Sequence, residues 1–354
     1  MAAKNQQTSK RKADHIGITL KEDIGFRQKR TGFELYEFEH NALPELNANT
    51  IDTSTKFLGK QLSFPFMVSS MTGGFLGAEK INSLLATVCN EFSVAMGVGS
   101  QRQALENSKY IKSFKIVRKN APGIPVIGNI GAAEIALIKN VSHIQRLVDT
   151  IQADAFAVHL NPLQEFLQPE GKTDFTGVLK GIENLVKYLN VPIIVKEIGA
   201  GISPTVAQKL MNVGVNIIDT AGAGGTSWAG VEIIRRNDDS LADTFWDWGI
   251  PTADSIIGIR KLSKKIFIIG SGGIRCGLDI AKALALGANV AASATPILKA
   301  LKQRGERGIS EILSLWKTEL RGVMFLVGAK NIETLKKTKI YGCKQRNYSI
   351  TTGN

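Results

Sequence analysis

The sequence predicts an α/β protein of the (β/α)8, or TIM, barrel class, with an N-terminal arm ahead of the barrel. Three observations lead to this prediction. From residue 64 onward, eight short apolar runs alternate with longer amphipathic stretches, the runs are apolar almost throughout, and glycine-rich or polar residues stand at the end of each run or just after it. Strands that are buried on both faces, as in an all-parallel sheet covered by helices, require such continuous apolar runs.

The predicted strands follow one another along the chain as FPFMVSS, SVAMGVG, PVIGNIG, AFAVHL, VPIIVKEI, NIIDTAG, IFIIGSG and ANVAASA. Between them, apolar residues recur three or four positions apart, which is typical of amphipathic helices, at 78–92, 142–152, 204–213 and 276–286. Residues 309–327 are expected to supply the last helix. Eight strand–helix units favour closure into a barrel, because an open doubly wound sheet is usually complete with about five or six strands.

The chain is expected to divide into three parts. Residues 1–63 form an N-terminal arm or cap that contributes to the substrate site, residues 64–333 form the barrel, and residues 334–354 form a polar C-terminal tail. No internal repeat or low-complexity linker indicates a second domain, and α/β barrels routinely reach this length as one domain.

The composition is that of an ordinary globular protein, with 44% apolar and 21% charged residues in 354. No apolar run approaches the ~18 to 20 residues needed to cross a bilayer, and the first residues lack the apolar stretch of a secretory signal. The three cysteines, Cys89, Cys276 and Cys343, are scattered without metal-ligand spacing. We therefore expect a cytoplasmic protein with no membrane partner, no disulfide framework and no zinc site.

The net charge of +13 is concentrated at the two ends of the chain. Residues 1–30 hold eight Lys and Arg against three acidic residues, and residues 299–346 hold twelve against four. This excess of basic residues has two interpretations. It is either a solvated surface or part of an arm that helps to hold a polyanion such as a diphosphate. Nucleic acid is not expected as a partner, because the basic segments carry few aromatic side chains to stack on bases.

Polar and glycine-rich motifs follow all eight predicted strands, which is where a barrel of this class carries its chemistry. In chain order the motifs are SSMTGG, GSQR, GNIG, HLNPLQE, VKEIGAG, DTAGAGGTSW, GSGGIR and SATP. The loops after strands seven and eight are the usual phosphate site of such barrels. Gly272 and Gly273 allow close backbone approach, and the N-terminus of the helix that begins near Cys276 favours an anion, so a cofactor phosphate is expected there.

Lys196 ends a strand that is otherwise apolar. A buried lysine needs an anionic partner or a depressed pKa. Three roles remain open: a Schiff-base nucleophile, a cation against the N1/C2 carbonyl region of a reduced flavin, or a structural ion pair with the adjacent Glu197.

Four polar residues, His159, Asn161, Gln164 and Glu165, lie within seven positions just past strand four. Glu165 is a hard oxygen ligand, and Mg²⁺ is commonly bound by one carboxylate together with substrate phosphates and water. In the arm, the RKADH motif places Arg11 beside Lys12. If the arm folds over the barrel mouth, these two side chains and Arg102 are expected to neutralise a diphosphate.

As a set, the motifs RKADH, SSMTGG, GSQR, GNIG, HLNPLQE, VKEIGAG, DTAGAGGTSWAG and GSGGIRCGLDIAKALALGA resemble those of the type 2 isopentenyl diphosphate isomerase family, over roughly residues 10–327. RKADH and HLNPLQE are the specific signatures, because other flavin barrels share the later motifs. The resemblance implies an FMN enzyme of isoprenoid biosynthesis that interconverts isopentenyl and dimethylallyl diphosphate without net redox change. It also implies Mg²⁺, NADPH as the reductant of the flavin, and assembly into a homotetramer or homo-octamer.

The same resemblance assigns roles to individual residues. It gives contacts with FMN to Ser69, Ser70, Met71, Thr72, Ser100, Asn129, Lys196 and Thr226, and the FMN phosphate to Gly272, Gly273, Arg275, Ala294 and Thr295. It implies that the substrate is bound by Arg11, Lys12, Ser100, Gln101, Arg102 and Gln164. It implies that Glu165 binds Mg²⁺. Gln164 and His159 would position the diphosphate and the reacting carbons, with reduced FMN as the acid and base.

Three other functions compete with this interpretation. A flavin barrel that oxidises 2-hydroxy acids shares the motifs after strands six to eight, but would need a His and Arg pair after a strand, and no histidine lies beyond His159. A nucleotide dehydrogenase of the inosinate type would carry a catalytic cysteine where this chain has Thr226. A non-catalytic basic module that binds RNA or an anionic membrane would rest on charge alone.

Overall fold

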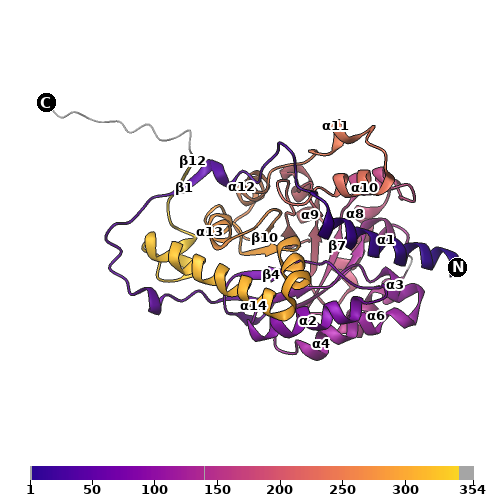
Figure 1. Ribbon diagram of the computed structural model, residues 1–354, viewed down its shortest axis with the longest axis horizontal. Helices are drawn as coiled ribbons and strands as arrows, with labels where there is room; N and C mark the ends of the chain where they lie inside the picture. The colour runs from indigo at the N-terminus through magenta and orange to yellow at the C-terminus, as the bar shows by residue number, and fades with distance from the viewer. Residues whose placement is uncertain (1, 139, 343–354) are drawn as a thin grey trace.

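Eight parallel strands form a closed barrel, in which each strand pairs with the next one along the chain and the last pairs with the first (Figure 1). The computed structural model describes residues 2–138 and 140–342, with side chains from residue 11 onward. The barrel strands are β4 (Phe66–Val68), β5 (Ala95–Gly97), β6 (Val126–Gly131), β7 (Ala155–His159), β8 (Ile193–Lys196), β9 (Ile217–Asp219), β10 (Phe267–Ser271) and β11 (Val290–Ser293). The predicted (β/α)8 class is confirmed, and each strand lies within one of the predicted apolar runs.

The barrel interior is filled by apolar side chains, and a hairpin closes its amino-terminal end. The interior cluster includes Met67, Ile127, Ile194 and Ile269, which the alternation of a strand turns inward. The hairpin strands are β2 (Thr55–Phe57) and β3 (Lys60–Leu62). Phe57 stacks on Phe267, the first residue of β10, with ring centroids 4.9 Å apart. A ligand can therefore enter the barrel from its carboxyl-terminal end.

An outer layer of helices covers the barrel and buries the second apolar face of the strands. These helices are α2 (Ala78–Glu91), α4 (Lys112–Asn120), α6 (Ser142–Ile151), α8 (Val178–Tyr188), α9 (Pro204–Asn212), α12 (Thr252–Leu262), α13 (Gly277–Ala285) and α14 (Thr295–Leu326). The last helix begins earlier than the predicted 309–327, and non-helical backbone at Arg304 and Gly305 divides it. Trp316 in its second half packs edge-on against Phe66, with centroids 5.4 Å apart.

Further helices complete the fold outside the ring of barrel helices. Helix α1 (Ala2–Lys21) lies beside α3 (Arg102–Glu106) and α10 (Trp228–Arg236), as Figure 1 shows. The remaining short helices are α5 (Ala132–Ile135), α7 (Pro162–Leu167), α11 (Ala242–Phe245) and α15 (Ile332–Leu335), with single 3-10 turns at η1 (Phe33–Leu35), η2 (Ala48–Thr50) and η3 (Ser108–Tyr110).

The expected polar tail includes one ordered strand. Strand β12 (Ile340–Gly342) pairs antiparallel with β1 (Tyr36–Phe38) of the expected arm, so these two distant parts of the chain meet beside the barrel. Residues 343–354 of this tail, with Cys343, lie outside the described residues. The boundaries of the three predicted parts stay predictions.

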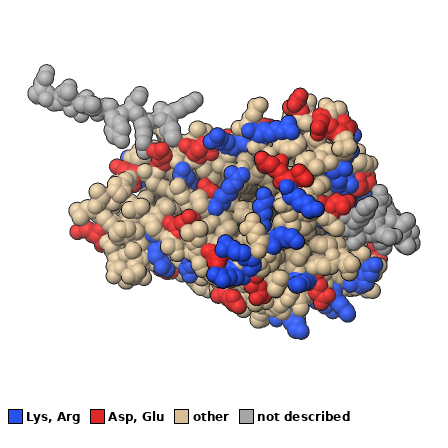
Figure 2. Space-filling model, in the orientation of Figure 1, with Lys and Arg blue, Asp and Glu red and all other residues tan. Residues whose placement is uncertain are grey.

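Basic and acidic side chains are mixed on one face of the protein (Figure 2). On the face shown in Figure 2, lysine and arginine side chains gather near the centre, with acidic side chains interspersed among them. The basic residues on this face therefore do not form a patch that is free of acidic residues. None of the described helices combines the length and the apolarity needed to cross a membrane.

Candidate active site

A cavity of about 560 Å³ opens at the carboxyl-terminal end of the barrel, under helix α1. This volume is in the range of small-molecule and cofactor sites. Residues at or just past the end of every barrel strand line it, among them Ser69, Asn129, His159, Lys196 and Ser271. The lining contains each residue that the sequence assigned to a site, apart from Thr72 and Gln101.

Thr72 and Gln101 are buried beside the cavity and bind other parts of the protein. The Thr72 hydroxyl bonds to the side chain of Asn82 on α2. Gln101 Nε2 donates to the Leu147 carbonyl at 3.2 Å, and Gln101 Oε1 accepts from the Asn129 N–H at 3.1 Å. Both ends of the Gln101 amide are therefore occupied by backbone groups, and its assigned contact with substrate stays a prediction.

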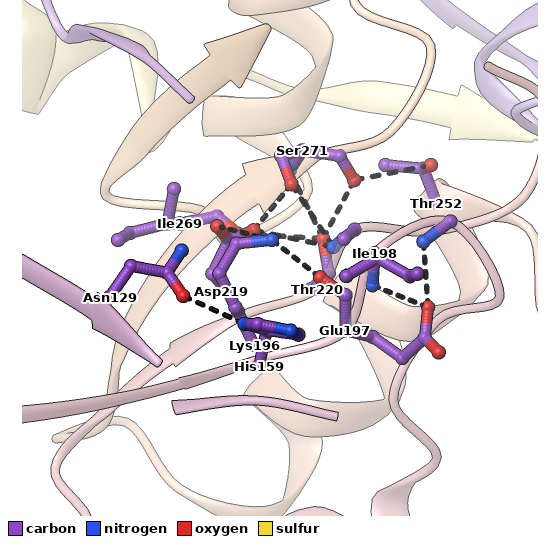
Figure 3. A network of polar contacts seen from close by, with 12 residues as sticks. Asn129, His159, Lys196, Glu197, Ile198, Asp219, Thr220, Thr252, Ile269 and Ser271 are labelled. Atoms are coloured by element: carbon purple, nitrogen blue, oxygen red, sulfur yellow. Dashed lines mark hydrogen bonds and ion pairs between the residues drawn. The ribbon is translucent and has the colours of Figure 1, made fainter. Parts of the chain in front are cut away.

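The floor of the cavity carries a buried lysine with a carboxylate beside it (Figure 3). Lys196 Nζ donates to the Glu197 carbonyl at 2.6 Å and lies 3.8 Å from Asp219 Oδ2. The Glu197 carboxylate is turned away, since its Oε2 accepts from backbone N–H groups of the following loop, including Gly199 at 2.7 Å. The ionic partner of Lys196 is thus Asp219, which the sequence reading missed because the two residues lie on different strands.

His159 is held in one orientation beside this lysine. Its Nδ1 atom lies 2.7 Å from Asn129 Oδ1, and because an amide oxygen can only accept, Nδ1 carries the proton. Burial lowers the pKa of His159 to about 3, and the charges of Lys196, Lys12 and Arg11 act in the same direction. His159 is therefore neutral at pH 7, and it orients a ligand without supplying a positive charge.

The turn between β10 and α13 and the start of α14 together form an anion cradle, which we define as Gly272, Gly273, Arg275 and Thr295. Gly272 and Gly273 have φ of 105° and 71°, and a Cβ at Gly273 would lie 2.8 Å from the Gly224 carbonyl oxygen. Glycine is required there for both reasons. Helices α13 and α14 are the next helices after β10 and β11, so two helix N-termini adjoin the cradle. At the start of α13 the Gly277 N–H donates to Glu319 Oε2 at 2.6 Å.

Three cationic side chains of the cavity lining, those of Arg11, Lys12 and Arg102, are held by other groups of the protein. Lys12 Nζ donates to the carbonyls of Gly73 at 2.9 Å and Ser100 at 2.8 Å. Burial lowers the pKa of Lys12 to about 7, with smaller effects from Arg11 and Arg102. Arg102 pairs with Glu106 and with Glu134, and Arg11 donates to Gln168. The arm thus places Arg11 and Lys12 in the cavity lining with Arg102, as the sequence led us to expect.

A polar chain links the strand-four loop to the arm through Glu232, which the sequence reading also missed. Gln164 Nε2 donates to Glu232 Oε1 at 2.9 Å, and His15 Nε2 lies at the same distance from that oxygen. Glu232 also pairs with Arg235 at 2.8 Å. The acidic residue in an otherwise apolar stretch of α10 was a signal in the sequence, but its partners come from other elements.

Glu165 lies in the lining with its two oxygens already engaged. Oε1 accepts from Asn161 at 2.9 Å, and Oε2 accepts from Gln168 and from the Lys172 N–H, both at 2.6 Å. Among the described residues, no group of three or more His, Cys, Asp or Glu side chains could hold a metal ion. Mg²⁺ fits this site only where a ligand's phosphate oxygens complete its coordination.

The lining suits FMN in its chemistry and shape. A buried ammonium at Lys196 matches the electron-rich edge of a flavin, and the anion cradle matches a phosphate. The hydroxyls of Thr226 and Thr295 are 2.7 Å apart beside the cradle. Because Gly272 and Gly273 leave room where a Cβ would meet backbone atoms, a phosphate can approach the loop closely.

Comparisons with known proteins agree with this arrangement. The family model described as "FMN-dependent dehydrogenase" matches residues 4–113 and 138–341. A protein named isopentenyl-diphosphate delta-isomerase from Chlorobium limicola is 47% identical over 344 residues, covering 93% of this chain and 95% of its own. Another of that name, from Methanothermobacter thermautotrophicus, is 44% identical over 332 residues, covering 94% of this chain and 93% of its own.

Solved structures show the same fold at low sequence identity. A protein described as a lactate oxidase from Pediococcus acidilactici superposes with a TM-score of 0.70 at 18% identity, covering 96% of this chain and 94% of its own. A flavocytochrome b2 variant gives 0.65, also at 18% identity, over 96% of this chain and 86% of its own. These two likenesses concern the fold alone.

Proposed function

The chain belongs to the FMN-dependent dehydrogenase family and, within it, to the isopentenyl-diphosphate delta-isomerases, and we propose that it interconverts isopentenyl and dimethylallyl diphosphate with bound FMN. The observation that carries this proposal is a cavity with two separate sets of anion-binding groups. The anion cradle follows β10 and β11, whereas Arg11, Lys12 and Arg102 come from α1 and α3. One set suits a cofactor phosphate, and the other suits the diphosphate of a substrate.

The reaction moves a double bond, so a proton is added at one allylic terminus and removed from the other. Bound FMN in its reduced state would supply the acid and base for this exchange, with no net redox change. The residues of the chain itself bind and orient the substrate. Arg11, Lys12 and Arg102 hold the diphosphate, and Gln164 and neutral His159 fix the hydrocarbon against the floor of the cavity.

Helix α1 has a further part in this proposal, because it covers the cavity. Its residues Ile16 and Thr19 line the cavity with Trp228, so an apolar wall adjoins the cationic mouth. A wall of this kind excludes water from the reacting carbons, which protects a carbocation-like or carbanion-like centre from side reactions.

The proposal also includes Mg²⁺ as a metal cofactor and NADPH as the reductant of FMN. Glu165 is the carboxylate that would bind Mg²⁺ together with the substrate diphosphate, and NADPH would reduce FMN without being consumed in each turnover. A cytoplasmic location and a homo-oligomeric assembly are also proposed. They rest on the family likeness and on the scattered cysteines.

Conversion of isopentenyl diphosphate by the purified protein under anaerobic conditions tests the proposal. FMN, Mg²⁺ and NADPH are each omitted in turn. Isomerisation that needs reduced FMN and Mg²⁺, without stoichiometric use of NADPH, is the expected result. A protein that binds FMN, fails to isomerise, and oxidises a 2-hydroxy acid would replace this function with that of the oxidase alternative.

A further inference from the structure

Asp219 is a fully buried carboxylate that lies just beneath the floor of the cavity and does not line it. Its Oδ1 accepts from the Ser271 hydroxyl and from the Ala221 N–H. Its Oδ2 has no hydrogen-bond partner within the described part of the chain and lies 3.8 Å from Lys196 Nζ (Figure 3). A buried carboxylate with one unpartnered oxygen is costly unless a cation compensates for it.

The register of the barrel puts Asp219 in this place. Strand β9 lies between β8 and β10, with Asp219 opposite Lys196 on one side and opposite Ile269 on the other. Asp219 therefore reaches two residues that do line the cavity, Lys196 and Ser271. It can influence a ligand through them, although it cannot touch the ligand itself.

We propose that Asp219 is a positioning residue, which pairs with the Lys196 ammonium, keeps it in place against the cofactor and so favours reduced over oxidised FMN. This inference rests on the proposed function, since it requires FMN in the cavity. Lys196 Nζ otherwise has a backbone carbonyl, that of Glu197, as its described partner, and a carbonyl cannot balance a buried charge. A fixed ammonium binds the more electron-rich reduced cofactor more tightly than the oxidised one.

The charged groups around this pair come from several elements. His159 on β7 is neutral and adjoins Lys196, and Arg11 and Lys12 of α1 act on His159 from above. The Glu197 carboxylate accepts hydrogen bonds from the backbone N–H groups of the loop after β8. Asp219 is thus the carboxylate that pairs with Lys196 on the floor, among the described residues.

Asp219→Asn tests the proposal with little change of shape. The new side chain keeps an oxygen for Ser271 and Ala221, and it replaces the oxygen beside Lys196 by an amide that cannot pair with an ammonium. The ratio of the dissociation constants of oxidised and reduced FMN, measured by anaerobic titration, is expected to fall about tenfold. This corresponds to a reduction potential lower by about 30 mV for a two-electron couple.

A double-variant cycle separates action through Lys196 from general damage. Lys196→Met is expected to lower the same ratio, and Asp219→Asn in that background to change it less than about twofold. Ser271→Ala removes a hydrogen-bond donor to Asp219 and should shift the ratio in the same direction by a smaller amount. This variant replaces Asp219→Asn as the test if Asp219→Asn does not accumulate as folded protein.

Asp154→Asn is the matched control. Asp154 pairs with Lys60 and Arg118 at the amino-terminal end of the barrel, so its loss should lower stability and leave the ratio unchanged. A wild-type protein that binds no FMN would overturn the proposed function itself. Wild-type binding and isomerisation, with a ratio that Asp219→Asn leaves within twofold or raises, would overturn this inference alone. So would an effect of Asp219→Asn that is undiminished in the Lys196→Met background.

Discussion

The Nε2 atom of His15 lies 2.9 Å from the Oε1 atom of Glu232. This contact joins helix α1, which precedes the barrel, to helix α10, which follows β9. Because Gln164 donates to the same oxygen, the position of the arm and the position of the strand-four loop depend on one carboxylate. The mouth of the cavity is therefore assembled from three distant parts of the chain.

The first prediction concerns stability at low pH. Burial by itself raises the pKa of Glu232, but the hydrogen bonds and charges of His15 and Arg235 outweigh it and lower the pKa from 4.5 to about 2. A depressed pKa contributes stability that is present above the unfolded pKa and is lost as the pH falls through the folded one. As the pH falls from above 4.5 to about 2, protonation of Glu232 should decrease the free energy of unfolding by on the order of 3 kcal/mol.

Denaturant titrations at a series of pH values between 5 and 2 would measure this decrease, with Glu232→Gln as the comparison. Other carboxylates titrate in both proteins, so the difference between the two curves isolates Glu232. The difference should shrink as the pH falls, and parallel curves would show that Glu232 is not stabilised as the contacts indicate.

The second prediction separates turnover from cofactor binding at Gln164. Its amide is held between Asn161 and Glu232, and it lines the cavity. In Gln164→Ala, kcat for isopentenyl diphosphate should fall about 100-fold, because misplacement of a substrate by about 1 Å has an effect of this size. The affinity for FMN should change less than about twofold. Gln145→Ala, on the outer helix α6, serves as the control. An equal loss of FMN from the Gln164 variant would refute this division of roles.

The third prediction concerns the metal. Glu165→Gln should abolish most of the stimulation of the reaction by Mg²⁺, since the lining then lacks the carboxylate that would complete the metal's coordination with the diphosphate. FMN binding should be unaffected. Activity is measured against Mg²⁺ concentration for this variant and for Glu183→Gln, which removes a surface carboxylate paired with Lys180. An unchanged Mg²⁺ dependence in Glu165→Gln would remove Glu165 from this role.

The fourth prediction concerns the anion cradle. In Gly273→Ala the new Cβ would lie 2.4 Å from the Thr31 methyl group and 2.8 Å from the Gly224 carbonyl oxygen, at a φ of +71°. FMN affinity should fall by at least tenfold, and the protein should be destabilised by roughly 2 kcal/mol or more. Gly59→Ala is the matched control, because Gly59 has a φ of +77° with no atom within 4 Å of the new Cβ. Its FMN affinity should equal that of the wild type, as measured by fluorescence titration.

The motifs at the strand ends predict most of the residues that line the cavity. Ser69, Asn129, His159, Lys196 and Thr226 all line it, as the motifs placed them, because the carboxyl ends of parallel strands meet at one end of a closed barrel. Gln101 shows the limit of this reasoning. Its neighbours Ser100 and Arg102 line the cavity, whereas its own side chain turns toward α6 and is buried. A motif does not specify which of its side chains points inward.

The sequence by itself determined the class of fold and the family, because buried parallel strands must be continuously apolar and the signature motifs are local. Only the tertiary structure decided the partners of the buried charges. Asp219 pairs with Lys196 because closure of the barrel brings adjacent strands into register, and Glu232 pairs with His15 because α1 packs beside α10. Each of these contacts joins residues on separate elements, so no local pattern of residues can encode it, and the energy of pairing a buried charge selects it only once the chain has folded.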